Sequence, residues 1–348
     1  MQRIAVALSL GQSNNPVKRK LEEDIVSQLS TDARFDLVVI PNLYDLKPKG
    51  KGVAALKTVE GDLIVLTWMY SRAAHWLLNR QGIAGQEGIS ELTYGDDDEE
   101  EETEKATDEE DKPRVIDEMP LPTRRLYCLD LRASQTVNDF VEEMGRIAQE
   151  IGSNGDLIDW IAGEPEQDAM QRFLNPTNDT AKGPPPSSQA VVQIEETAGR
   201  RWYPVIDFSR CTNCMECIDF CLFGVYGVDQ QETILVEQPD NCRKGCPACS
   251  RVCPENAIIF PQHKTPAIAG AAVATDGLKI DLSKLFGAPD SKEDAQQVAA
   301  RERDEQLLLA GRKAVGSDAC MPKRQDRKPE TTKDDLDDLI DELDDMDL

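Results

Sequence analysis

The sequence is poor in aromatic and basic side chains and has no long apolar run. Aromatic residues make up 5% of its 348 residues, and 39 Lys and Arg residues stand against 65 Asp and Glu residues, giving a formal net charge of −26. This negative charge disfavours binding to nucleic acid or to an anionic membrane and favours a partner with a basic surface. The longest apolar stretches, such as residues 63–70, are far shorter than the roughly 20 residues that span a bilayer.

Motifs of export, nucleotide binding and catalysis are also missing. Residues 4–10 are short for the apolar core of a secretion signal, and no A-x-A cleavage site follows them. The chain has no GxxxxGK[ST] motif, no GxGxxG motif and no recognisable nucleophile triad. We therefore expect a cytoplasmic protein, and a stand-alone enzyme is the less favoured class.

Cysteine, in contrast, is concentrated in one region. Eight of the ten cysteines form two runs, CTNCMECIDFC at 211–221 and CRKGCPACSRVC at 242–253, and each run lies between short apolar segments. This similarity indicates an internal duplication. Secreted disulfide scaffolds are usually short chains without a core, and structural zinc usually takes two separated pairs of ligands. The spacing therefore favours iron–sulfur chemistry over both alternatives.

Residues 203–262, which contain both runs, resemble the bacterial ferredoxins that carry two [4Fe-4S] clusters. In that pattern the fourth cysteine of each run ligates the cluster of the other run. The resemblance implies that cluster I is bound by Cys211, Cys214, Cys217 and Cys253, and cluster II by Cys242, Cys246, Cys249 and Cys221. Residues 202–229 also resemble an uncharacterised group of bacterial multi-domain ferredoxin-like proteins.

Two features depart from the ferredoxin pattern. Leu222 stands where a proline usually follows the first run, and one extra residue lies between Cys242 and Cys246. Proline at that place mainly fixes the turn of the chain, so its absence should not remove a ligand. The longer loop should change the surroundings of cluster II.

Residues 1–163 alternate between apolar runs of strand length and helical segments. The expected strands are residues 4–10, 35–41, 62–69 and 124–131, and the expected helices are residues 16–30, 53–59, 71–82 and 137–152. Strands that alternate with helices form parallel sheets covered on both faces. The sequence thus predicts a three-layer α/β domain with a four-stranded parallel sheet, flavodoxin-like or chelatase-like.

Two loops of this domain are candidate ligand sites, because ligands bind at the carboxyl ends of parallel strands. Residues 9–15 precede a helix N-terminus and could hold a phosphate, such as that of FMN, although any strand–helix turn favours the same residue types. Trp68, Tyr70, Arg72 and His75 follow the third strand and could surround a planar ligand. The alternative places Trp68 in the core and His75 in solvent.

The remaining segments are acidic or rich in proline. We expect an acidic, solvated insertion at 95–118 and a linker at 164–200, followed by the ferredoxin-like domain at 201–263. Residues 264–348 should form an extension with a helix near 290–313. Its acidic tail at 334–348 has apolar residues on one helical face, so it either binds a groove or remains solvated.

The function that we expect is electron transfer through two [4Fe-4S] clusters, with the α/β domain docking a redox partner protein. The alternative is an oxidoreductase in which the α/β domain binds a flavin or another small molecule and the clusters supply electrons to it. A third possibility is a scaffold in which the clusters are structural and the acidic segments bind partners.

Overall fold

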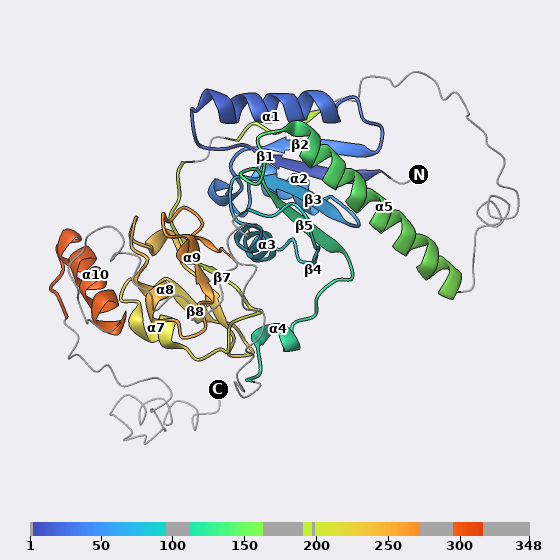
Figure 1. Ribbon diagram of the computed structural model, residues 1–348. Helices are drawn as coiled ribbons and strands as arrows, with labels where there is room; N and C mark the ends of the chain where they lie inside the picture. The colour runs from blue at the N-terminus through green and yellow to red at the C-terminus, as the bar shows by residue number, and fades with distance from the viewer. Residues whose placement is uncertain (1–2, 95–111, 163–190, 197–198, 272–294, 316–348) are drawn as a thin grey trace, which may run out of the picture.

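The computed structural model describes residues 3–94, 112–162, 191–196, 199–271 and 295–315 (Figure 1). Within these residues the chain forms two units that pack against each other. The α/β unit contains residues 3–94, 112–162 and 191–196 and is built on one parallel sheet. The cysteine unit, residues 199–271, contains both cysteine runs and two small antiparallel sheets.

The sheet of the α/β unit has six parallel strands in the order β4-β5-β3-β1-β2-β6. The strands are β1 (Ile4–Ser9), β2 (Phe35–Ile40), β3 (Leu63–Thr67), β4 (Gln86–Glu87), β5 (Arg125–Asp130) and β6 (Val192–Gln193). The four long strands coincide with the four predicted ones to within two residues at either end. Their order, β2-β1-β3-β5, is that of a doubly wound sheet.

The expected count of four strands was wrong, because each edge of the sheet has one additional short strand. β4 pairs with β5, and β6 pairs with β2. A strand of two residues has no alternation of polar and apolar side chains, so sequence cannot reveal it. β6 also lies inside the expected linker at 164–200, of which residues 163–190 fall outside the described residues.

Helices cover both faces of the sheet, which confirms the α/β architecture. α1 (Pro16–Leu29) and α5 (Val137–Ala162) pack on one face, where Ile25 and Phe140 join the core of the long strands. α2 (Lys51–Lys57) and α3 (Ser71–Arg80) pack on the other face through Val53 and Trp76. Figure 1 shows α1 and α3 on opposite sides of the strands.

The cysteine unit consists of two halves with the same order of elements. The elements are β7 (Val205–Ile206), α7 (Glu216–Phe220), β8 (Tyr226–Val228), β9 (Ile234–Val236), α8 (Ala248–Val252) and β10 (Ile258–Ile259). Each cysteine run therefore follows a strand, contains a short helix and leads into a second strand. β7 pairs with β10 and β8 pairs with β9, both antiparallel, so the two halves close on each other.

Three further helices lie beside these elements. They are α4 (Val115–Glu118), α9 (Pro266–Ala269) and α10 (Ala295–Leu309), the last within the helix expected near 290–313. Residues 334–348 of the expected acidic tail lie outside the described residues. Among the residues that the structure describes, no helix is long and apolar enough to cross a membrane.

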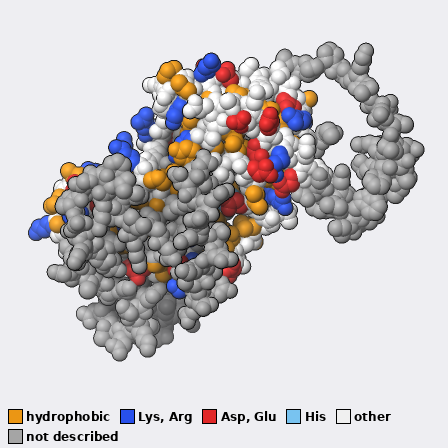
Figure 2. Space-filling model, viewed as in Figure 1, with side chains coloured by type: hydrophobic (Ala, Val, Ile, Leu, Met, Phe, Trp, Pro, Cys, Tyr) orange, Lys and Arg blue, Asp and Glu red, His pale blue; other side chains and the backbone are white. Residues whose placement is uncertain are grey.

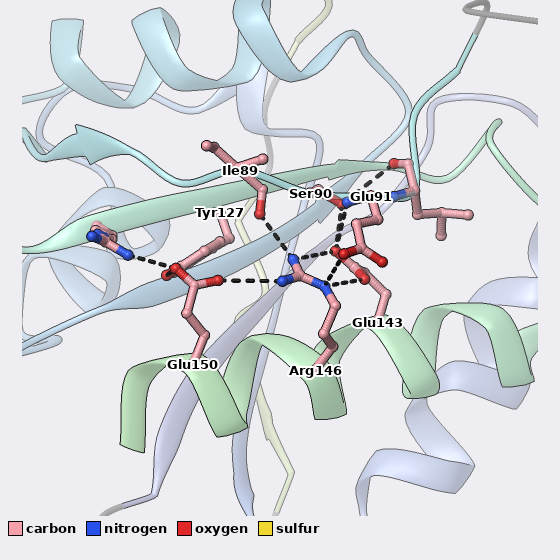
Figure 3. Close-up of polar contacts among 9 residues, drawn as sticks. Ile89, Ser90, Glu91, Tyr127, Glu143, Arg146 and Glu150 are labelled. Atoms are coloured by element: carbon pink, nitrogen blue, oxygen red, sulfur yellow. Dashed lines mark hydrogen bonds and ion pairs between the residues drawn. The ribbon is translucent and has the colours of Figure 1, made fainter. Parts of the chain in front are cut away.

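The two ends of the acidic insertion are anchored on different units. On the α/β side, Arg146 of α5 donates to the carbonyl of Ile89 at 3.0 Å, and Glu143 accepts the amide of Glu91 at 2.9 Å (Figure 3). On the face of the α/β unit that Figure 2 shows, acidic and basic side chains lie next to one another. On the other side, Arg114 pairs with Glu255 of the cysteine unit at 2.9 Å. Residues 95–111 lie outside the described residues.

A stacked pair of tyrosines forms part of the junction between the units. Tyr44 of the α/β unit and Tyr203 of the cysteine unit are fully buried, with ring centroids 4.3 Å apart. The Tyr203 hydroxyl donates to the carbonyl of Tyr44 at 2.8 Å, and the Tyr44 hydroxyl accepts the amide of Tyr203 at 2.6 Å. Tyr203 belongs to the same apolar core as α2 and α3, so the two units share one core.

A buried ion pair holds the same junction. Arg72, in the first turn of α3, donates through Nε to Asp207 at 2.5 Å and through Nη2 to the carbonyl of Asn256 at 2.6 Å. The side chains of Arg72 and Asp207 are 9% and 1% exposed. A buried charge without its partner is strongly destabilising, so both residues must be kept or lost together.

We predict that Arg72→Met lowers the free energy of unfolding by about 3 kcal/mol, because the buried Asp207 carboxylate loses its hydrogen-bonded cation and keeps only the more distant Arg210, at 3.7 Å. Urea unfolding followed by circular dichroism measures the change. The double variant Arg72→Met/Asp207→Asn should recover much of the loss, since it removes the buried carboxylate together with its hydrogen-bonded cation. A single-variant loss of less than about 1 kcal/mol would contradict the role given to this pair.

Candidate iron–sulfur site

The fold brings the eight clustered cysteines into two groups of four. The fourth cysteines, Cys221 and Cys253, immediately follow the short helices α7 and α8. The thiols of Cys211 and Cys217 interact electrostatically with that of Cys253, and the thiols of Cys242 and Cys249 with that of Cys221. Each fourth cysteine thus lies near the first three of the other run. The assignment of these residues as cluster ligands stays a prediction.

One of these groups surrounds a cavity. The cysteines that line it are Cys221, Cys242, Cys246 and Cys249, which is the set expected for cluster II. Its remaining wall is mainly apolar and includes Phe220, Phe223 and Tyr226. An apolar wall lowers the local dielectric and limits the access of water, and both effects influence the potential of a bound cluster.

Burial favours the protonated form of these thiols when no metal is bound. It is the main reason that the pKa of Cys211 is raised to about 11, and the neighbouring thiols contribute to this rise. Burial likewise raises the pKa of Cys217 and Cys249. Metal binds the deprotonated sulfur, so these buried thiols would release their protons as a metal centre assembles.

Hydrogen-bond donors point at several of the sulfur atoms. The amide of Asn213 donates to Cys211 Sγ at 3.4 Å, and the amide of Ala257 donates to Cys253 Sγ at 3.2 Å. The hydroxyl of Tyr226 donates to Cys249 Sγ at 3.1 Å. Such bonds stabilise negative charge on sulfur and are one of the levers that set the potential of an iron–sulfur cluster.

The two loops that depart from the ferredoxin pattern differ in their backbone conformation and contacts. In the first run Asn213 and Met215 adopt positive φ angles of 58° and 64°. In the longer second run this conformation falls on Gly245, with φ of 86°, where glycine has no steric penalty. After the first run, Arg312 donates to the carbonyl of Leu222 at 3.2 Å, so the turn that lacks a proline is held by a side chain from beyond α10.

The donor set is compatible with an iron–sulfur cluster. Within the described part of the chain, no group of three or more His, Cys, Asp or Glu side chains converges on one metal position. A cubane cluster does not need such convergence, because each of its four thiolates binds a different iron atom. The grouped thiols are therefore compatible with iron–sulfur binding, and the number and type of clusters stay predictions.

The candidate phosphate loop of the α/β unit is occupied by a carboxylate of the chain itself. Glu22 of α1 is 3% exposed, and its Oε1 atom accepts the amide of Gly11 at 2.7 Å and the indole N–H of Trp68 at 2.8 Å. A bound phosphate would need the same amide and would be repelled by the carboxylate. FMN binding stays a prediction, and the contact between Glu22 and Gly11 argues against a phosphate in this loop.

The second candidate site does not assemble either. Arg72 is committed to Asp207, and Trp68 donates to Glu22, so neither side chain is available to surround a ligand. His75 is 3% exposed, which corrects the alternative that placed it in solvent, and burial lowers its pKa. Sequence indicated the strand ends but could not show that partners from distant segments already bind these side chains.

Comparisons with known proteins found similarity over a short segment of the chain. No model of a protein family and no solved structure matches the chain. Over 66 residues it is 50% identical to the uncharacterized ferredoxin MJ0251 of Methanocaldococcus jannaschii, which covers 19% of this chain and 44% of that protein. Over 59 residues it is 36% identical to pyruvate synthase subunit PorD of the same organism, covering 17% of this chain and 66% of that protein.

These matches concern a segment and not the whole chain. The chain spans less than two thirds of the length of either relative. They establish a ferredoxin-like segment within the chain. The number of clusters and the arrangement of the domains are not set by them and remain predictions.

Sequence reasoning missed three residues that contact the cysteine groups. Tyr226 counts as an apolar core residue by composition, yet its hydroxyl donates to the sulfur of Cys249, an expected ligand. The indole N–H of Trp202 donates to the carbonyl of Cys246 at 3.1 Å. Arg303 lies in a helix far along the chain and lines the cavity of the second group. The spacing of cysteines gives no signal for any of them.

Paired substitutions can test the crossed assignment of the ligands. If Cys253 shares a cluster with Cys214, the variant Cys214→Ala/Cys253→Ala should lose one cluster and keep about half of the iron. The variant Cys246→Ala/Cys253→Ala should then lose nearly all of it, because it removes a ligand from each cluster. Iron and sulfide analysis of protein purified without oxygen measures both. The reverse pattern would mean that each run binds its own cluster.

We predict that Tyr226→Phe lowers the reduction potential of cluster II without loss of iron. Burial raises the pKa of Tyr226 well above its usual value, so the hydroxyl keeps its proton and remains a donor to Cys249. Removing that donor destabilises the more negative, reduced cluster. A potentiometric titration measures the shift, with Tyr94→Phe, which is remote from the cysteines, as the matched control. An unchanged potential would contradict a role for this hydrogen bond.

Proposed function

We propose that the chain transfers single electrons through two [4Fe-4S] clusters held in the cysteine unit. The observation that carries this proposal is the grouping of the cysteines into two sets of four, each completed by the fourth cysteine of the other run. The identity to a ferredoxin over the same kind of segment supports it. The bound clusters would supply the site that accepts and releases an electron.

The chain's own residues have three roles in this process. The eight cysteines hold the clusters, and amide and hydroxyl donors to their sulfur atoms stabilise the added negative charge. The apolar wall around the second group keeps water away from the sulfur atoms. No substrate is transformed, so the thiolates act as ligands and not as nucleophiles.

The α/β unit docks a redox partner in this proposal. Its junction with the cysteine unit is buried and paired, so a partner bound to the α/β unit would stand in a fixed position relative to the clusters. One relative is named as a subunit of pyruvate synthase, which supports a place for such segments within redox assemblies. The flavin alternative lacks a comparable observation, since Glu22 occupies the loop that it requires.

An ultraviolet–visible spectrum of the whole chain, purified without oxygen, tests the proposal. We expect a broad absorption shoulder that bleaches with dithionite, together with roughly eight iron and eight sulfide per chain. Each cluster accepts one electron, so the bleaching should be reversible on mild oxidation. Structured flavin bands over the shoulder would favour the oxidoreductase alternative. A colourless protein that still binds metal would indicate zinc and would contradict the proposal.

A further inference from the structure

Helix α10 lies outside the expected ferredoxin-like domain, yet it packs directly on the cysteine unit. Figure 1 shows it beside α8, on the side of the cysteine unit away from the parallel sheet. Ala299, Ala300 and Leu307 are buried there, and Glu302 pairs with Arg251 of α8 at 2.9 Å. These contacts fix α10 against the helix that carries Cys249 and leads into Cys253.

One side chain of α10 reaches the cavity of the second cysteine group. Arg303 is buried and lines the cavity together with Cys221, Cys242, Cys246 and Cys249. Its guanidinium carbon lies 4.7 Å from the centroid of the Phe220 ring. Among the described residues that line this cavity, Arg303 is the one with a charged side chain.

Nearby acidic groups partly offset the charge of Arg303. Asp304 accepts from Nε of Arg303 at 3.1 Å and also pairs with its Nη2 at 3.1 Å. Arg303 lines the cavity with the four cysteines, whereas Asp304 is not among its lining residues. Glu302, which interacts electrostatically with Cys246, is itself paired with Arg251.

A cation in this position acts on the two redox states unequally. A cluster with four thiolate ligands carries net negative charge, and reduction adds one more. A neighbouring positive charge stabilises the reduced state more than the oxidised state, and an apolar wall screens this attraction less than water does. The reduced state is thereby favoured and the reduction potential rises.

We propose that Arg303 of α10 raises the reduction potential of cluster II, so that α10 is a part of the redox site and not only a structural extension. This inference rests on the proposed function, since it requires that cluster II is bound by the second cysteine group. Arg303 is a positioning residue in this sense: it acts on the cluster electrostatically and takes no part as a ligand.

Substitution of Arg303 in the full-length protein tests the inference. We expect Arg303→Gln to shift the midpoint potential of cluster II to a lower value and to leave cluster I nearly unchanged. Arg303→Lys, which retains the charge, should have a midpoint potential close to that of the wild-type protein. The control is Arg301→Gln, which removes the same charge from an exposed position of the same helix. Potentiometric titration with electron paramagnetic resonance follows each cluster. The signal of cluster II is identified as the one that remains in the variant Cys214→Ala/Cys253→Ala.

Each outcome decides the matter. Equal shifts in Arg303→Gln and Arg301→Gln, or no shift in Arg303→Gln, overturn the inference. If Arg303→Gln fails to assemble cluster II, Arg303→Met provides the test, because its apolar side chain can pack against Phe220 without the charge. A lower potential in Arg303→Met supports the inference, and an unchanged or higher one overturns it. Wild-type protein without iron and sulfide would overturn the proposed function as well, whereas assembled clusters with unaltered potentials overturn this inference alone.

Discussion

The buried pairing of Arg72 with Asp207 is the interaction on which the arrangement of the candidate site depends. Asp207 stands four residues before Cys211, and its carbonyl accepts the amide of Cys211 at 3.0 Å. Its own amide donates to the carbonyl of Ala257 at 2.8 Å, and the amide of Ala257 donates to Cys253 Sγ. Two ligands expected for cluster I, from different runs, are thus tied through one aspartate to an arginine of the α/β unit.

This constraint explains why the two units behave as parts of one molecule. Tyr203 and Val205, which begin the cysteine unit, complete the apolar core under α2 and α3. The strand ends of the parallel sheet, where a doubly wound domain usually binds a ligand, are partly used for this junction through Arg72. The α/β unit therefore packs against the cysteine unit through the end of its sheet that a ligand would otherwise use.

A segment that follows the cysteine unit in the sequence also contacts it. Arg303 lines the cavity of the second cysteine group, and Arg312 contacts the turn after Cys221. Elements that precede and follow the cysteine unit thus enclose it from two sides. The matches to the two relatives extend over 66 and 59 residues, so most of the chain lies outside them.

The sequence by itself determined the features that depend on local pattern. The alternation of apolar runs and helical segments predicted the four long strands and the helices between them, because burial of one face imposes a period on the chain. The cysteine spacing predicted which residues could bind clusters, since thiolate is the ligand that iron–sulfur chemistry requires.

Tertiary structure alone decided the remaining features. The two-residue edge strands, the occupation of the Gly11 amide by Glu22, the burial of His75 and the approach of Arg303 all join residues far apart in sequence. Such contacts leave no periodic or compositional trace, because they depend on how the finished elements pack.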